Sequence, residues 1–178
     1  MIRRDDFPTK SPTGFSALPR SVVAEALGVK PTALPPGDLP LERLAARFLA
    51  YLRAGDEENP PPPDHPDGWT YALFDSLTTD HPALALAAIR AALAACETPE
   101  DVAAVAAGPL EDLIAAHGAA MIDEIEARAA ASPRFAYALT GVWQRETPPQ
   151  LWARIETARA GVPALDDGAP VPPADSLV

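Results

Sequence analysis

The residues best suited to chemistry lie in an acidic stretch in the second half of the chain. Glu111, Asp112 and His117 could bind Mn, Fe or Zn, because these metals take carboxylate and imidazole ligands. Asp123 and Glu126 follow within the same stretch. A metal-assisted hydrolase that uses Glu111, Asp112 and His117 is therefore one hypothesis for this protein.

The spacing of these residues argues against a metal site. Helical metal sites often carry His-x-x-x-His or Glu-x-x-His, and neither pattern occurs in this sequence. We therefore favour a role for His117 at a helix end or in a hydrogen bond, and we expect no metal and no cofactor.

Motifs of other enzyme classes are also missing from the sequence. It contains no G-x-S-x-G nucleophile turn and no glycine-rich phosphate loop of the Walker or dinucleotide-binding type. Cys96 is the only cysteine, so no internal disulfide can form, and its Ala/Leu surroundings favour a buried, inert thiol. We therefore expect a protein that is not an enzyme.

The charge of the chain narrows the choice of partner and compartment. A net charge of −11 argues against binding to nucleic acid or to an anionic membrane surface. The first residues carry charges and a proline where a signal peptide needs an apolar run, and no apolar run is long enough to span a bilayer. We expect a cytoplasmic protein without a transmembrane segment.

Acidic and basic residues are separated along the sequence. Residues 97–127 carry eight acids and no Lys or Arg, whereas residues 128–159 carry five arginines and two acids. A solvated face, with acids placed at helix starts, is the simpler interpretation. The alternative is a face that binds a basic partner or the basic arm of the chain itself. The candidate partner-binding residues are Glu100, Asp101, Glu111, Asp112, Asp123 and Glu124, with Phe7 and Phe15 as apolar anchors in the arm.

The elements that would position these residues are predicted to be short α-helices. Apolar residues recur at helical spacing, and Ser, Thr, Asp, Gly and Pro punctuate the pattern. The predicted helix starts are Ser21, Asp38, Asp80, Thr98, Ser132 and Thr147, and the predicted ends include Gly28, Gly55, Gly108 and Gly161. The segment 82–96 is apolar on two sides, which places it at the centre of the fold.

Gly118 leaves two interpretations open. The apolar residues from Leu110 to Ile125 form one stripe if a single helix runs through this glycine. We prefer a break, because His-Gly is a common way for a helix to end.

The fold class that follows is all-α, an irregular, helical-repeat-like stack of short antiparallel helices. Residues 1–37 form a Pro-rich N-terminal arm with a short helix, residues 38–161 the helical domain, and residues 162–178 a flexible tail. The stretch 55–67 inside the domain is an acidic, Pro-rich loop that we interpret as a stiff connector. Trp69, Trp143 and Trp152 could form an aromatic recognition patch, but each lies on an apolar helical stripe, so we expect at least two of them in the core.

One set of motifs resembles a known family. The chain reads AAGPLEDL at residues 106–113, His-Gly at 117–118, IDEIE at 122–126 and SPRFAYALTGVW at 132–143. In order and spacing these motifs resemble a family of uncharacterised bacterial domains, and the likeness extends over residues 69–156. The resemblance implies an all-helical domain and no established activity.

The function that we favour from the sequence is a non-catalytic protein–protein interaction module or an accessory subunit of a larger assembly. Segregated charge and long Pro-rich ends motivate this hypothesis. A sharper variant is an immunity or inhibitor protein whose acidic face neutralises a basic toxin or nuclease, and the hydrolase described above remains the enzymatic alternative.

Overall fold

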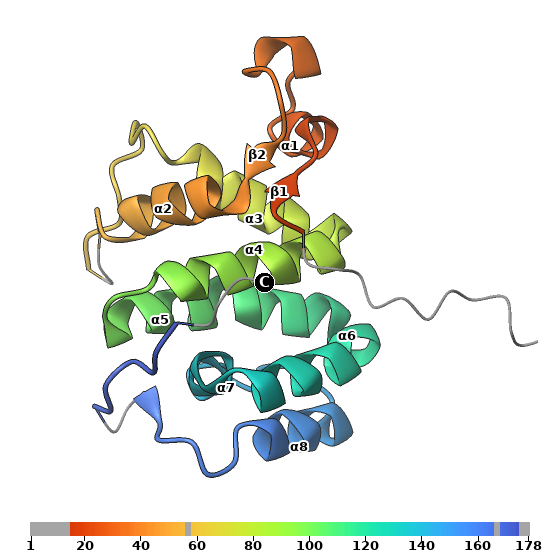
Figure 1. The fold of residues 1–178 in the computed structure, drawn as a ribbon, viewed down its shortest axis with the longest axis vertical. Coiled ribbons are helices and arrows are strands. Elements are labelled where there is room, and N and C mark those ends of the chain that lie inside the picture. Colours follow the sequence, from red (N-terminus) through yellow and green to blue (C-terminus); the bar gives the residue numbers. More distant parts are fainter. Residues whose placement is uncertain (1–14, 56–57, 166–167, 175–178) are drawn as a thin grey trace, which may run out of the picture.

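The computed structural model describes residues 15–55, 58–165 and 168–174, and short α-helices stacked on one another make up most of this part of the chain (Figure 1). The helices are α1 Arg20–Ala26, α2 Leu41–Leu52, α3 Trp69–Asp80, α4 Pro82–Ala95, α5 Pro99–Val105, α6 Glu111–Ala131, α7 Pro133–Leu139 and α8 Pro149–Ala158. Two short turns of other helix types occur at η1 Pro31–Ala33 and η2 Ala106–Leu110. The predicted all-α class is confirmed.

Helix α4 lies at the centre of the stack. It packs against α2, α3, α5, α6 and α7, and it crosses the middle of Figure 1 between α2 and α3 on one side and α6 and α7 on the other. Ala88, Ile89 and Ala92 are all buried. Alanines let neighbouring helices approach closely, so the two-sided apolar pattern predicted this position correctly.

Two of the predicted helix caps are present. Thr98 Oγ1 accepts a hydrogen bond from the Asp101 amide at 3.2 Å, and the Asp101 carboxylate accepts one from the Thr98 amide at 3.2 Å, which is a complete capping box at α5. Ser132 Oγ accepts from the Phe135 amide at 2.9 Å and caps α7.

The other predicted caps are wrong. Ser21 lies inside α1, Asp80 is the last residue of α3, and α8 begins at Pro149 without a side-chain bond from Thr147. Asp38 does not cap α2; its Oδ1 instead accepts the Arg20 amide at 3.1 Å, at the start of α1. The contact spans eighteen residues and is invisible to a local pattern.

The two glycines of the central region behave differently. At Gly108 the backbone leaves the helical region, with φ −101° and ψ −110°, and Pro109 follows, so the predicted break is present. At Gly118 the predicted break is wrong, because α6 runs without interruption from Glu111 to Ala131. A Cβ on Gly118 would lie 2.7 Å from Leu151 Cδ2, so this glycine allows α8 to approach α6.

The N-terminal segment is attached to the domain from residue 15 onward. The strand β1 Ala17–Leu18 pairs with β2 Leu39–Pro40 in an antiparallel ladder, and Leu18 is fully buried. Phe15, one of the predicted anchors, lies half in solvent, and Phe7 falls outside the described residues.

Described residues beyond 161, predicted as a flexible tail, contact α7. The Tyr137 hydroxyl donates to the Ala169 carbonyl at 2.7 Å, and Arg134 Nε donates to the Pro172 carbonyl at 2.8 Å. Leu165 and Val171 pack against the core. None of the described helices is long and apolar enough to cross a lipid bilayer.

An ion pair joins the end of α2 to the start of α5. Arg53 donates from Nε and Nη2 to the two carboxylate oxygens of Asp101, at 2.8 and 2.6 Å. Asp101 is only 6% exposed. The Arg53 hydrogen bond, aided by backbone donors at Glu97 and Thr98, lowers the pKa of Asp101 from 3.8 to about 2.

We predict that Asp101→Asn destabilises the protein by about 1–2 kcal/mol at neutral pH; the half-exposed partner Arg53 keeps the loss below that of a fully buried pair. Because the folded pKa lies below the unfolded one, this stabilisation is complete above the ordinary pKa of 3.8 and is lost as the pH falls towards about 2. Urea unfolding at a series of pH values measures it, and the two proteins should converge in acid.

Glu97→Gln is the matched control, since Glu97 lies 3.7 Å from Arg53 but its side chain is 78% exposed. Its unfolding free energy should change by less than about 0.5 kcal/mol. Equal losses from both variants would contradict a special role for Asp101.

Candidate functional site

Most of the predicted acidic face is paired with arginines of the same chain. Arg154 Nη2 lies 2.6 Å from Asp123 and 2.6 Å from Glu126, and Arg128 donates to Glu124 at 2.7 Å. The hydrogen bond from Arg154 lowers the pKa of Glu126. The face therefore carries less free negative charge than the sequence alone indicates.

The six acidic candidates differ in exposure. Asp101 and Glu111 are buried and bound to Arg53 and Arg145, whereas Glu100, Asp112 and Asp123 are exposed and Glu124 is half-buried. The structure thus brings Glu111 and Asp112 together near Arg145. It places Asp123 and Glu124 more than two turns further along α6.

The residues of the hydrolase hypothesis do not converge on one point. His117 Nε2 lies 2.8 Å from the Thr79 carbonyl, at the end of α3. Glu111 and His117 are six residues apart on α6, about 9 Å along its axis. In the described part of the chain, no three His, Cys, Asp or Glu side chains lie close enough together to hold a metal ion.

The cysteine is placed for packing. Cys96 is buried at the end of α4, and its Sγ lies 3.3 Å from the Ala92 carbonyl. Burial raises the pKa of the thiol to about 12, so the nucleophilic thiolate is scarce at neutral pH.

The most unusual side chain on the surface is Trp143, which is 72% exposed. It lies in the connection between α7 and α8, immediately after the buried Val142. A Cβ on Gly141 would lie 2.5 Å from Leu165 Cδ1 and 3.1 Å from Ala106 Cβ, so the chain is closely packed just before the tryptophan. The backbone is thus anchored at the point where the indole enters solvent.

A buried carboxylate from another helix holds this connection in place. The Trp143 amide donates to Glu111 Oε2 at 2.8 Å, and Arg145 Nε pairs with Glu111 Oε1. Glu111 is only 3% exposed. Arg145 has a φ of +42°, a left-handed conformation that a residue with a side chain rarely adopts, and the Glu111 pair offsets its cost.

A second clamp comes from Arg159, the residue that follows α8. Arg159 Nη1 donates to the Leu139 carbonyl at 3.0 Å and to the Val142 carbonyl at 3.3 Å. Its guanidinium also lies 4.8 Å from the ring centroid of Trp152, a cation–π contact that fixes its position. Trp143 therefore extends from a segment held on both sides.

Charged side chains of both signs lie next to the connection that carries Trp143. Arg145 Nη1 lies 3.9 Å from Asp112 Oδ1, whose side chain is half exposed. Burial raises the pKa of Asp112, and the charges of Glu111 and Asp75 add to this while Arg145 opposes it. Asp75 of α3 is thus an electrostatic neighbour, and the exposed Tyr71 lies one turn before it on the same helix.

Comparison with known proteins assigns a family. A family of unknown function (DUF6869) matches residues 57–162, more than half of the chain. The chain belongs to this family. No curated protein and no solved structure matches it. The resemblance seen in the sequence is confirmed, and the DUF6869 region includes α3 to α8 together with Trp143 and Glu111.

The expectation that at least two tryptophans lie in the core agrees with the structure, but the sequence did not single out Trp143 as the exposed one. The apolar spacing of Phe135, Leu139, Val142 and Trp143 predicts one helical stripe, but α7 ends at Leu139 and the stripe ends with it. Of the three tryptophans, Trp152 is buried and Trp69 is packed against the core. Gly141, next to a helix end, is the local signal that marks the change of direction.

We predict that Glu111→Gln destabilises the protein by about 1–3 kcal/mol, because a buried charge pair is broken while Arg145 remains solvated. Hydrogen exchange at the Trp143 amide should accelerate by a larger factor than that of amides in α4, since the bond to Glu111 is local. Asp112→Asn, one residue away and exposed, is the control and should leave both quantities nearly unchanged. An unaltered Trp143 exchange rate in Glu111→Gln would contradict the clamp.

Proposed function

We propose that this DUF6869 protein is a non-catalytic interaction module that binds a protein with a basic surface through Trp143 and the carboxylates beside it. The observation that carries the proposal is that a tryptophan 72% exposed extends from a backbone bonded to the buried Glu111 at 2.8 Å. Tryptophan is among the residue types most enriched at interface hot spots.

Rigid presentation favours binding. A partner that covers Trp143 removes a large apolar surface from water. Because Glu111 and Arg159 already hold the backbone, little conformational freedom of the loop is lost when the partner binds. An exposed indole on a mobile loop would not have this advantage.

Charge indicates the nature of the partner. Glu146 follows the tryptophan by three residues, and Asp112 follows Glu111, whose carboxylate accepts the Trp143 amide; both are exposed, and the whole chain carries −11. A Lys or Arg of the partner would find carboxylates at the rim and the indole face for a cation–π contact. Both an accessory-subunit role and an inhibitor role would use this surface, and the identity of the partner distinguishes them.

A non-catalytic role is supported by the use that the fold makes of its polar residues. Glu111 is bonded to the Trp143 amide and to Arg145, and His117 is bonded to a carbonyl of α3. Both side chains are therefore committed to contacts within the fold.

We predict that Trp143→Ala weakens partner binding by at least about tenfold, the scale of an interface hot spot, without lowering the melting temperature, since the indole makes few contacts within the fold. The tagged protein is expressed in the cells that produce it, crosslinked and purified, and co-purifying proteins are quantified by mass spectrometry. The expected partner is recovered in stoichiometric amount and has a basic surface.

Val29→Ala is the matched control, because Val29 is an exposed apolar residue that follows α1, at the end of the stack away from α7 and α8 (Figure 1). This variant should recover the same partner as the unaltered protein. A monomeric protein with no stoichiometric partner, or equal recovery with Trp143→Ala, refutes the proposal.

A further inference from the structure

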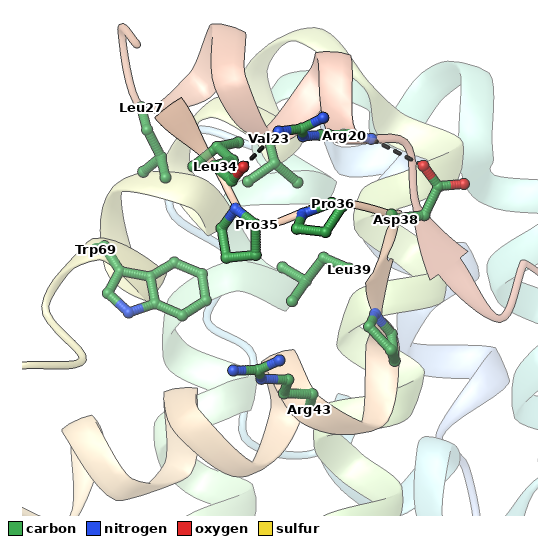
Figure 2. A pocket seen from close by; sticks show the side chains of 12 residues that line it. Arg20, Val23, Leu27, Leu34, Pro35, Pro36, Asp38, Leu39, Arg43 and Trp69 are labelled. Carbon is green, nitrogen blue, oxygen red and sulfur yellow. Dashed lines mark hydrogen bonds between the residues drawn. The ribbon is translucent and has the colours of Figure 1, made fainter. Parts of the chain in front are cut away.

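A cavity of about 320 Å³ lies where the N-terminal segment meets the family domain. Its walls come from α1, from the stretch 34–40, from the first turn of α2 and from Trp69 at the start of α3 (Figure 2). This volume is at the lower end of the range for small-molecule sites, and the site is too small for a folded partner.

The walls are mostly apolar and stiff. Figure 2 shows the indole of Trp69, the ring of Pro35 and the side chain of Leu39 around the same space. Prolines have a fixed φ and bury no amide hydrogen, so this part of the wall is preformed. A flat apolar group could lie against the indole and the proline ring.

Two guanidinium groups add positive charge to this apolar space. Arg43 lines the cavity from α2, is exposed, and forms no hydrogen bond or ion pair with any described residue. Figure 2 shows its guanidinium extending towards the side of the cavity formed by Trp69. Arg20 lines the opposite side and donates from Nη2 to the Leu34 carbonyl.

Arg20 also has a hydrogen-bond donor without an acceptor. Its Nε is enclosed and is the single buried side-chain nitrogen or oxygen without a partner in the described part of the chain. A buried donor without an acceptor is unfavourable, and a charged one more so. Because Nε is enclosed, it does not itself face a ligand; what Arg20 brings to the cavity is a guanidinium charge that forms no ion pair with a described residue.

Neither of these two arginines forms an ion pair with a described residue. Arg53, Arg145 and Arg154 are each paired with one or more carboxylates. The one acid that lines the cavity, Asp38, already accepts the Arg20 amide at 3.1 Å. The cavity lining thus carries two guanidiniums against one carboxylate, which makes it a locally positive site for an anion in a protein of net charge −11.

We propose that this cavity binds a small organic anion with a flat apolar body and a carboxylate or phosphate group. The apolar body lies against Trp69 and Pro35, and the oxyanion accepts hydrogen bonds from Arg43 and Arg20. Arginine suits both oxyanions because its planar donors match two oxygens at once. The site is separate from Trp143 and does not depend on the function proposed above.

The test uses the full chain and four probes: 2-naphthoate, 2-naphthyl phosphate, the neutral 2-naphthylmethanol and inorganic phosphate. Isothermal titration calorimetry and amide NMR shifts at physiological ionic strength give affinity and location. We expect saturable one-to-one binding of at least one aryl anion, with shifts at Trp69 and residues 34–40, and binding at least about tenfold weaker for the neutral probe and for inorganic phosphate. Comparison of the two aryl anions identifies the preferred oxyanion.

Arg43→Gln tests the site without disturbing the fold, because Arg43 has no hydrogen bond or ion pair to lose among the residues that the structure describes. It should weaken binding of the aryl anion about tenfold and leave the melting temperature unchanged. Lys30→Gln removes one exposed positive charge outside the cavity and should bind like the unaltered protein. No saturable binding, equal binding of the neutral probe, or an unaffected Arg43→Gln variant overturns the proposal.

Discussion

The stack depends on α4 being covered by its neighbours on nearly every side. Ala85, Ala88, Ala91 and Ala92 are buried along it, and each contributes little apolar area of its own. Their small size instead lets α2, α3, α6 and α7 approach closely, so that the leucines and isoleucines of these helices close the core. A larger residue at any of these four positions would have to separate two helices that meet there.

Arginine side chains join helix ends that the apolar core does not hold together. Arg134 Nη1 donates to the carbonyls of Leu93, Ala94 and Cys96 at 2.9, 3.1 and 3.0 Å, which satisfies acceptors left open at the end of α4. Arg159 does the same for the end of α7, with the Leu139 and Val142 carbonyls. An acidic chain thus uses its few cations to join helix ends and to pair buried carboxylates, rather than to balance charge evenly over its surface.

Features that depend on contacts between residues close in sequence could be predicted, whereas features that depend on distant residues could not. Thr98 and Ser132 act within three residues of their own position, so the pattern of a hydroxyl followed by proline identified both caps, although the same pattern at Thr147 gave the wrong answer. Gly118 and Asp38 depend on partners far along the chain, on α8 and on α1, and local rules gave the wrong answer for both. The all-α class was predictable because helical spacing is itself a local property.

The candidate site could be predicted only in part, because local sequence rules do not reveal tertiary contacts. Glu111 and Asp112 were identified as acids of a helix start, but whether such an acid faces solvent or holds a loop thirty-two residues away depends on tertiary packing. Trp143 looked like a core residue because its spacing from Phe135 is helical, and only the end of α7 at Leu139 shows otherwise. Exposure of a large apolar residue is a property of the assembled fold.

The two sites belong to different parts of the chain. Trp143, Glu111, Arg145 and Arg159 all lie inside residues 57–162, so the clamp that presents the indole is built wholly within the family domain. The cavity takes one wall, Trp69, from that domain, and its other lining residues precede residue 57. The N-terminal segment therefore covers a tryptophan face of the family domain and adds two arginines to it. The lining of the cavity and the contacts of the Trp143 clamp share no residue, so a single substitution in one leaves the contacts of the other in place, and the two proposed sites can be tested separately.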